Sequence, residues 1–189
     1  MRFQSKSGAI PESESKFAPI RLSSDFPVSE VDVNIRGEVS DVPPHIHDCL
    51  ELEFCYSGEG LFLVEDKILP FRAGNAVLIN NREVHVMMSS PGGKTRWMFL
   101  NLDPAALLAG YVNERDERLE TASFCGESFP NVIDEARFPG VAPLIRAIVE
   151  ARLNEPAGFA SEIRALVIRN GIRESVLCRR SVATSSRPR

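Results

Sequence analysis

Between residues 50 and 102 short apolar runs alternate with turn-like segments, and this rhythm most constrains the fold. The runs cover residues 50–56, 61–65, 68–71, 76–79, 84–88 and 97–102. The segments between them are rich in Gly, Asn, Asp, Ser and Pro, which favour tight turns. Short strands at spacings of about 8–12 residues, with no helices between them, are typical of antiparallel sandwiches and barrels. The sequence therefore predicts a mainly β fold and disfavours a parallel α/β sheet.

Upstream of these runs the chain changes character near residue 31. In residues 31–36 apolar and polar side chains alternate, which is the period of a half-buried strand. Residues 1–24 are rich in Ser, Glu and Lys and contain Pro11 and Pro19. Such a composition buries little apolar surface, so we expect a mobile arm.

Helical signals begin where the strand-like runs end. Asp103 can cap a helix, Pro104 suits its first position and Gly110 can close it, so a short helix is expected here. Beyond Pro139 an apolar stripe has helical spacing, and it consists of Val141, Leu144, Ile145, Ile148, Val149 and Leu153. After a turn at 155–158 a second stripe begins at Phe159. The two stripes predict an antiparallel helical hairpin.

These signals divide the chain into five parts. They are a flexible N-terminal arm (1–24), a barrel (25–110), an irregular connection (111–138), a helical hairpin (139–178) and a disordered basic tail (179–189). The tail contains four arginines and no acid, with few groups that could pack.

Composition excludes several classes of function. The net charge of −4 gives no reason for the whole molecule to bind nucleic acid or anionic membranes. With 43% apolar residues and no signal peptide or run of about 20 apolar residues, we expect a cytoplasmic protein without membrane contact. The four cysteines show no CxxC pair or zinc spacing, so reduced thiols are expected.

The three histidines all lie in the predicted barrel. His45 and His47 are two residues apart, so on a strand both side chains point to one face. Glu51 could follow from the same strand after a bend, and His85 could complete a site from the opposite wall. Three imidazoles and a carboxylate suit Fe, Mn or Zn, but the same groups could line a ligand pocket without metal. Glu53 competes with Glu51, because both point the same way on a regular strand.

Aromatic side chains in the barrel region offer a second kind of binding surface. Trp97, Phe54, Tyr56 and Phe62 could stack on a ligand, although aromatic residues in a small barrel usually belong to its core. No single one of them is assigned to a site.

Two motifs in this region resemble those of a known superfamily. The pattern His45-x-His47-x3-Glu51-x6-Gly58 is similar to the first cupin motif, and its spacing favours Glu51 over Glu53. The stretch from Gly74 to His85 is similar to the second cupin motif, with departures at Asn80 and Arg82. The resemblance implies a cupin-type antiparallel β-barrel (jelly roll), followed here by the C-terminal helical hairpin.

Across roughly residues 30–178 the sequence resembles the sensor domain of AraC-type transcription regulators. The phrases LINNREVH and FLNLDP carry most of this resemblance. It implies a non-enzymatic module that binds a small-molecule effector through His45, His47, Glu51 and His85, with no required cofactor. It also implies a homodimer through residues 139–170, supported by the stripe that includes Ile148.

DNA binding in that family belongs to helix-turn-helix units that follow the hairpin. The tail RRSVATSSRPR shows no such pattern, so contact with DNA is expected only through a domain missing here. The alternative hypothesis is a stand-alone metal-dependent cupin enzyme of the dioxygenase or isomerase type, which would use Fe, Mn or Zn at the same four residues.

Overall fold

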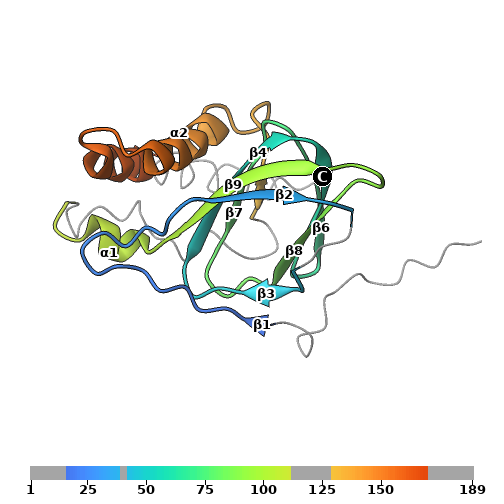
Figure 1. The fold of residues 1–189 in the computed structure, drawn as a ribbon, viewed down its shortest axis with the longest axis horizontal. Coiled ribbons are helices and arrows are strands. Elements are labelled where there is room, and N and C mark those ends of the chain that lie inside the picture. The colour runs from blue at the N-terminus through green and yellow to red at the C-terminus, as the bar shows by residue number, and fades with distance from the viewer. Residues whose placement is uncertain (1–15, 39–41, 112–128, 170–189) are drawn as a thin grey trace, which may run out of the picture.

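The computed structural model describes residues 16–38, 42–111 and 129–169. Within these residues, ten strands form two five-stranded sheets that face each other in a sandwich (Figure 1). Sheet A has the order β1-β3-β8-β5-β6, with bounds Lys16–Phe17, His45–Ile46, His85–Ser89, Glu59–Val64 and Lys67–Arg72. Sheet B has the order β10-β7-β4-β9-β2, with bounds Val132–Ile133, Ala76–Ile79, Leu50–Ser57, Thr95–Leu102 and Asp32–Arg36. Apart from β1 and β3, the paired strands run antiparallel, which confirms the predicted mainly β fold.

Strand β4 shows how the sequence builds both faces of sheet B. Leu50, Leu52 and Phe54 belong to the apolar cluster that includes the helices. Glu51 and Glu53 alternate with them and line the space between the two sheets. Successive side chains of a strand point to opposite faces, so one strand separates the helical layer from the interior.

The helical signals near residues 103 and 139 are confirmed. Helix α1 spans Pro104–Leu108, and the Asp103 side chain accepts a hydrogen bond from the amide of Ala106 at 3.0 Å. Helix α2 spans Val141–Asn154 and ends at Glu155, whose φ of 44° lies in the left-handed region. A further helix covers residues 159–169, while residues 170–178 of the predicted hairpin lie outside the described part of the chain.

The apolar stripe of α2 packs on the outer face of sheet B of its own chain (Figure 1). Ile145, Ile148 and Val149 are fully buried there, whereas Leu153 is 44% exposed. These three side chains are therefore already covered within the chain, and the homodimer through residues 139–170 stays a prediction. Burying each such side chain within the chain contributes roughly 1.5–3 kcal/mol to folding.

Three short strands were not predicted, because two-residue strands leave no periodic signal. Lys16 and Phe17 form β1 and pair with His45 and Ile46 of β3, so this part of the expected mobile arm has a fixed place. Residues 1–15 and the predicted tail at 179–189 lie outside the described residues. Strand β10 lies in the segment expected to be irregular. Within the described residues, no helix is long and apolar enough to cross a membrane.

Candidate functional site

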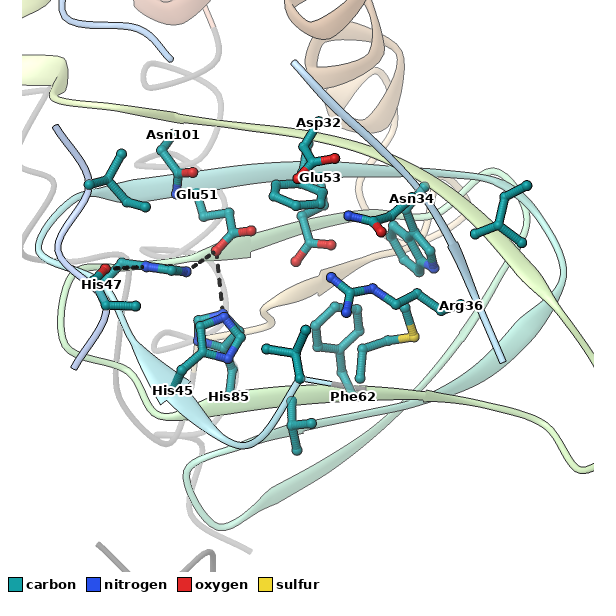
Figure 2. A pocket seen from close by; sticks show the side chains of 18 residues that line it. Asp32, Asn34, Arg36, His45, His47, Glu51, Glu53, Phe62, His85 and Asn101 are labelled. Atoms are coloured by element: carbon teal, nitrogen blue, oxygen red, sulfur yellow. Dashed lines mark hydrogen bonds and ion pairs between the residues drawn. The ribbon is translucent and has the colours of Figure 1, made fainter. Parts of the chain in front are cut away.

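A cavity of about 420 Å³ lies between the two sheets (Figure 2). Its walls combine the histidines and Glu51 with polar residues of β2 and with the aromatic side chains of Phe62, Trp97 and Phe99. Cavities of this size are typical of small-molecule sites, which usually combine an apolar lining with a few polar groups. The four site residues predicted from the sequence all face this cavity.

The three imidazole rings form one cluster. The ring centroids of His45 and His85 are 4.3 Å apart, those of His45 and His47 are 4.8 Å apart, and those of His47 and His85 are 5.3 Å apart. One ligand nitrogen from each ring can be chosen so that all three lie within 4.8 Å of one another. The three rings are therefore close enough to bind one ion or one polar group together.

The route by which the fold assembles this cluster differs from the predicted one. His45 and His85 are directly paired on neighbouring strands of sheet A, so they share one wall. Glu51 lies on β4 of sheet B, opposite that wall. The expectation that Glu51 shares a strand with His45, with His85 on the opposite wall, is therefore wrong. The chain crosses from one sheet to the other between Ile46 and Leu50.

Each imidazole is held by a backbone carbonyl. The Nδ1 atoms of His45, His47 and His85 lie 3.0, 2.9 and 3.0 Å from the carbonyl oxygens of Pro43, Ala18 and Glu83, respectively. A carbonyl oxygen can only accept, so each Nδ1 carries the hydrogen. In the neutral rings Nε2 is then a bare acceptor, which is the tautomer that histidine ligands of metals adopt.

Glu51 faces two of these bare nitrogens. Its Oε2 lies 3.1 Å from Nε2 of His47 and 3.3 Å from Nε2 of His85, and it has no donor among the described residues. Burial alone would raise the pKa of Glu51, but its contacts with the two imidazoles outweigh burial and lower it below its usual range. Lone pairs that face a carboxylate repel it, so the arrangement needs a cation between them, either a proton or a metal.

The protonation of the other two groups follows from the same geometry. Burial and then the charge of His85 lower the pKa of His45 to about 4. For His47 burial acts downward, but the contact with Glu51 prevails and raises its pKa. A proton held in the cluster therefore belongs to His47. The set of three imidazoles and a carboxylate equally fits a divalent first-row metal.

The two candidate carboxylates occupy different surroundings. Both Glu51 and Glu53 are buried and line the cavity, but the contacts with the imidazoles of His47 and His85 are made by Glu51. Burial, followed by the charge of Glu51, raises the pKa of Glu53 well above its usual value, against the opposing charge of Arg36. The geometry thus favours Glu51 over Glu53 as the partner of the imidazoles.

Strand β2 supplies residues that sequence reasoning did not assign to the site. Asp32, Asn34 and Arg36 line the cavity, whereas Val33, which alternates with them, is 47% exposed; Ile35 also borders the cavity but is 70% exposed. The polar side of this strand therefore faces the cavity. The alternation in residues 31–36 identified the strand, but alternation does not say which face a ligand cavity will occupy.

Strand β9 contributes two further lining residues with unpaired polar atoms. The indole Nε1 of Trp97 and the side-chain Nδ2 of Asn101 are buried and have no hydrogen-bond partner among the described residues. Trp97 and Phe62 also belong to the apolar cluster of the interior, whereas Phe54 packs with the helices on the outer face of sheet B. Of the four aromatic residues considered, Trp97 and Phe62 thus line the cavity.

Comparisons with known proteins give one matching family. The family model described as "AraC-like ligand binding domain" matches residues 35–165. No curated protein matches the chain.

Three solved structures show how distant the similar folds are. A cupin protein from Bacteroides fragilis shares 18% identity with a TM-score of 0.38, over 46% of this chain and 70% of its own. A cupin 2 conserved barrel domain protein from Salinispora arenicola shares 13% identity with a TM-score of 0.37, over 56% of this chain and 92% of its own. The AraC-like transcriptional activator CuxR shares 16% identity with a TM-score of 0.41, over 79% of this chain and 48% of its own.

Proposed function

Because the chain belongs to the family of AraC-like ligand-binding domains, we propose that it is a sensor that binds a small-molecule effector in the cavity between its sheets. The observation that carries this proposal is the cavity itself, whose polar groups include buried atoms without partners. Unsatisfied buried polar atoms cost free energy, and a bound effector that pairs with them recovers it. The proposal treats the protein as a non-enzymatic, cytoplasmic regulator that requires no cofactor.

A direct contact path from the cavity to the helices supports a sensing role. Arg36 and Asn34 on β2 line the cavity, and Glu30 lies just before the same strand. The Glu30 carboxylate accepts a bond of 2.5 Å from Arg152, a side chain of α2 that is only 8% exposed. Displacement of β2 by an effector would therefore act on the hairpin, the proposed output and dimerisation element.

Transcription regulation would complete this role through DNA-binding units separate from the described residues. An effector that binds one conformation of the sensor more tightly shifts the population toward it, and the hairpin would pass this shift on.

The proposed sensor can be tested through Trp97, the only tryptophan in the sequence. Because its indole lines the cavity, occupancy should change its fluorescence. We expect a library of small polar molecules to yield compounds that shift this fluorescence and also raise the melting temperature, since a ligand of the native state stabilises it. A library in which every stabilising compound leaves Trp97 fluorescence unchanged would place binding elsewhere and contradict the proposal.

A metal-dependent cupin enzyme is the second candidate, favoured by the cluster of three imidazoles, two of which face Glu51 through Nε2. A metal bound there would act as a Lewis acid, and His45, His47, His85 and Glu51 would hold it.

Elemental analysis of protein purified without chelator tests this metal site. A resident metal should be lost in His45→Ala, His85→Ala and Glu51→Gln, because each variant leaves an incomplete ligand set. Glu53→Gln is the matched control, since this glutamate is also buried, whereas the ion-pair contacts with the imidazoles are made by Glu51. Full metal content in His45→Ala and His85→Ala would show that the cluster is not the metal site.

A further inference from the structure

Besides the histidine cluster, the cavity contains a second basic group, the guanidinium of Arg36. Arg36 enters from β2, and its side chain extends between Glu53 and Phe62 (Figure 2). Among the described residues no side chain forms a hydrogen bond or ion pair with its guanidinium. The charge of Arg36 acts on Glu53, but no bond joins the two groups. A partly buried guanidinium thus keeps its fork of donors free for a ligand.

Register places Arg36 and Glu51 at opposite ends of the cavity wall. On β9, Asn101 is paired with Glu51, while Thr95 is paired with Arg36. The two pairs are six residues apart along β9, or roughly 20 Å of strand, although the long Arg36 side chain reaches back toward the middle. A ligand between them therefore meets a donor fork at one end and a carboxylate acceptor at the other.

The surface between these two ends is largely apolar. Phe62 is 1% exposed and Met87 is 8% exposed, and both line the cavity together with Phe99. These side chains offer contact area but no hydrogen bonds. The middle of a complementary ligand is therefore apolar, apart from a group that can face Glu53.

We propose that this cavity selects small carboxylic acids whose carboxylate is bound by Arg36 and whose far end carries an amine or hydroxyl directed at Glu51 and Glu53. The assignment rests on the proposed sensor function and names its ligand class. A guanidinium fork matches a carboxylate with two parallel charge-assisted bonds. The amine or hydroxyl at the far end of the ligand donates hydrogen bonds to Glu51 and Glu53. Neither the guanidinium nor the carboxylates are then buried without a partner.

Charge balance favours a carboxylate over a phosphate ester. The lining contains one arginine, Arg36, and the carboxyl groups of Asp32, Glu51 and Glu53, while His47 and His85 face Glu51 at the other end of the cavity. A phosphate would bring close to two negative charges toward these acids, with a single guanidinium to offset them. A single carboxylate paired with an amine brings no net charge into the cavity.

Tranexamic acid is a suitable probe, because its saturated ring separates a carboxylate from an aminomethyl group and does not absorb where Trp97 does. Its carboxamide lacks the anionic end, and cyclohexanecarboxylate lacks the donor end. Titrations followed by Trp97 fluorescence and by calorimetry should rank tranexamic acid above both analogues. We expect a preference of about tenfold or more over the carboxamide, the value of one charge-assisted hydrogen-bonded contact.

The variant Arg36→Gln should abolish the preference for carboxylate over carboxamide, and Arg36→Lys should retain only part of it. Arg96→Gln is the matched control: it removes the same charge from a neighbouring strand, at an exposed position paired with Ile35. Arg96→Gln should keep the wild-type preference. Unfolding curves of all variants check that the fold is intact.

Three outcomes would overturn the assignment, and they differ in what they say about the sensor. If the carboxamide binds as tightly as tranexamic acid, or if Arg36→Gln keeps the preference, the ligand class is wrong while small-molecule binding in the cavity stands. If none of the three probes changes Trp97 fluorescence while neutral library compounds do, the carboxylate assignment fails and the sensor remains. If no compound of any class changes it, both fail.

Discussion

At the scale of single residues, the site depends on three backbone carbonyls as much as on the imidazoles they hold. Ala18, Pro43 and Glu83 each accept the Nδ1–H of a different histidine. These bonds turn every Nε2 toward the cavity, where Glu51 faces two of them. Pro43 and Glu83 hold His45 and His85 from two residues away in the chain, whereas the orientation of His47 depends on the packing of the segment that contains Ala18.

The first prediction concerns the order in which the histidines take up protons in protein freed of metal by chelation. His45 should become protonated near pH 4, because its buried ring lies against His85, while His47 should become protonated above the usual pH 6.5. NMR titration is unambiguous here, since the chain has only three histidines. A His45 signal that titrates at pH 6.5 or above would contradict the geometry of the cluster.

The same shift has a consequence for stability. The folded-state pKa of His45 is lowered from 6.5 to about 4, so its contribution is full above pH 6.5 and is lost as the pH falls to about 4. The variant His45→Gln should therefore show a weaker loss of unfolding free energy across this window than the wild type. Chemical denaturation at several pH values measures it.

At the scale of elements, α2 and β2 show that a sequence pattern can identify a helix or strand correctly without showing what its apolar or polar face packs against. The helical stripe is real, but its residues cover sheet B of the same chain. In β2 the alternation is real, but the polar side faces the cavity. In both elements the local pattern says which residues share a face, and only packing says what that face meets.

The second prediction follows from the burial of α2. Ile148→Ala should lower the free energy of unfolding by about 2–5 kcal/mol, because a fully buried side chain leaves a cavity against sheet B. Leu153→Ala, at a position 44% exposed on the same helix, should cost less than about 1 kcal/mol. Urea denaturation compares the two variants, and equal losses would mean that α2 does not pack as described.

At the scale of the whole molecule, sheet B connects the two halves of the proposed function. One of its faces lines the cavity through Glu51 and Glu53, and the other carries the helices through Leu52 and Phe54. The Glu30–Arg152 contact adds a second connection at the edge of the sheet. A ligand that shifts β2 or β4 would therefore displace the helices that pack on sheet B, without any separate linker.

The third prediction concerns assembly. We expect a two-fold symmetric homodimer through residues 139–170 at micromolar concentration, detectable by sedimentation. Since the Ile148 side chain is fully buried within its own chain, its replacement by Asp should unfold the protein rather than produce a folded monomer. Leu153→Asp is the informative variant, because it changes an exposed apolar side chain of the hairpin and should weaken the dimer while the fold persists. A wild-type monomer at that concentration would contradict the homodimer.

Much of the fold was predictable from the sequence because its signals are local. The alternation in LELEFC identifies a strand and separates Glu51 and Glu53 from Leu50 and Leu52. The cap at Asp103 and the stripe beginning at Val141 likewise depend on neighbours within a few residues. The four residues that the resemblance to the cupin motifs indicated all line one cavity.

Only the tertiary structure decided how distant segments meet. It placed His85 beside His45 and Glu51 across from them, brought Ala18 to His47, and turned Arg36 into the cavity. Strand pairing depends on hydrogen bonds between backbones far apart in sequence, which leave no trace in local periodicity. The sequence thus indicates which residues belong to the cluster. Which strands form the walls of the cavity, and that β2 is one of them, depends on the pairing of strands and on the faces that these strands enclose.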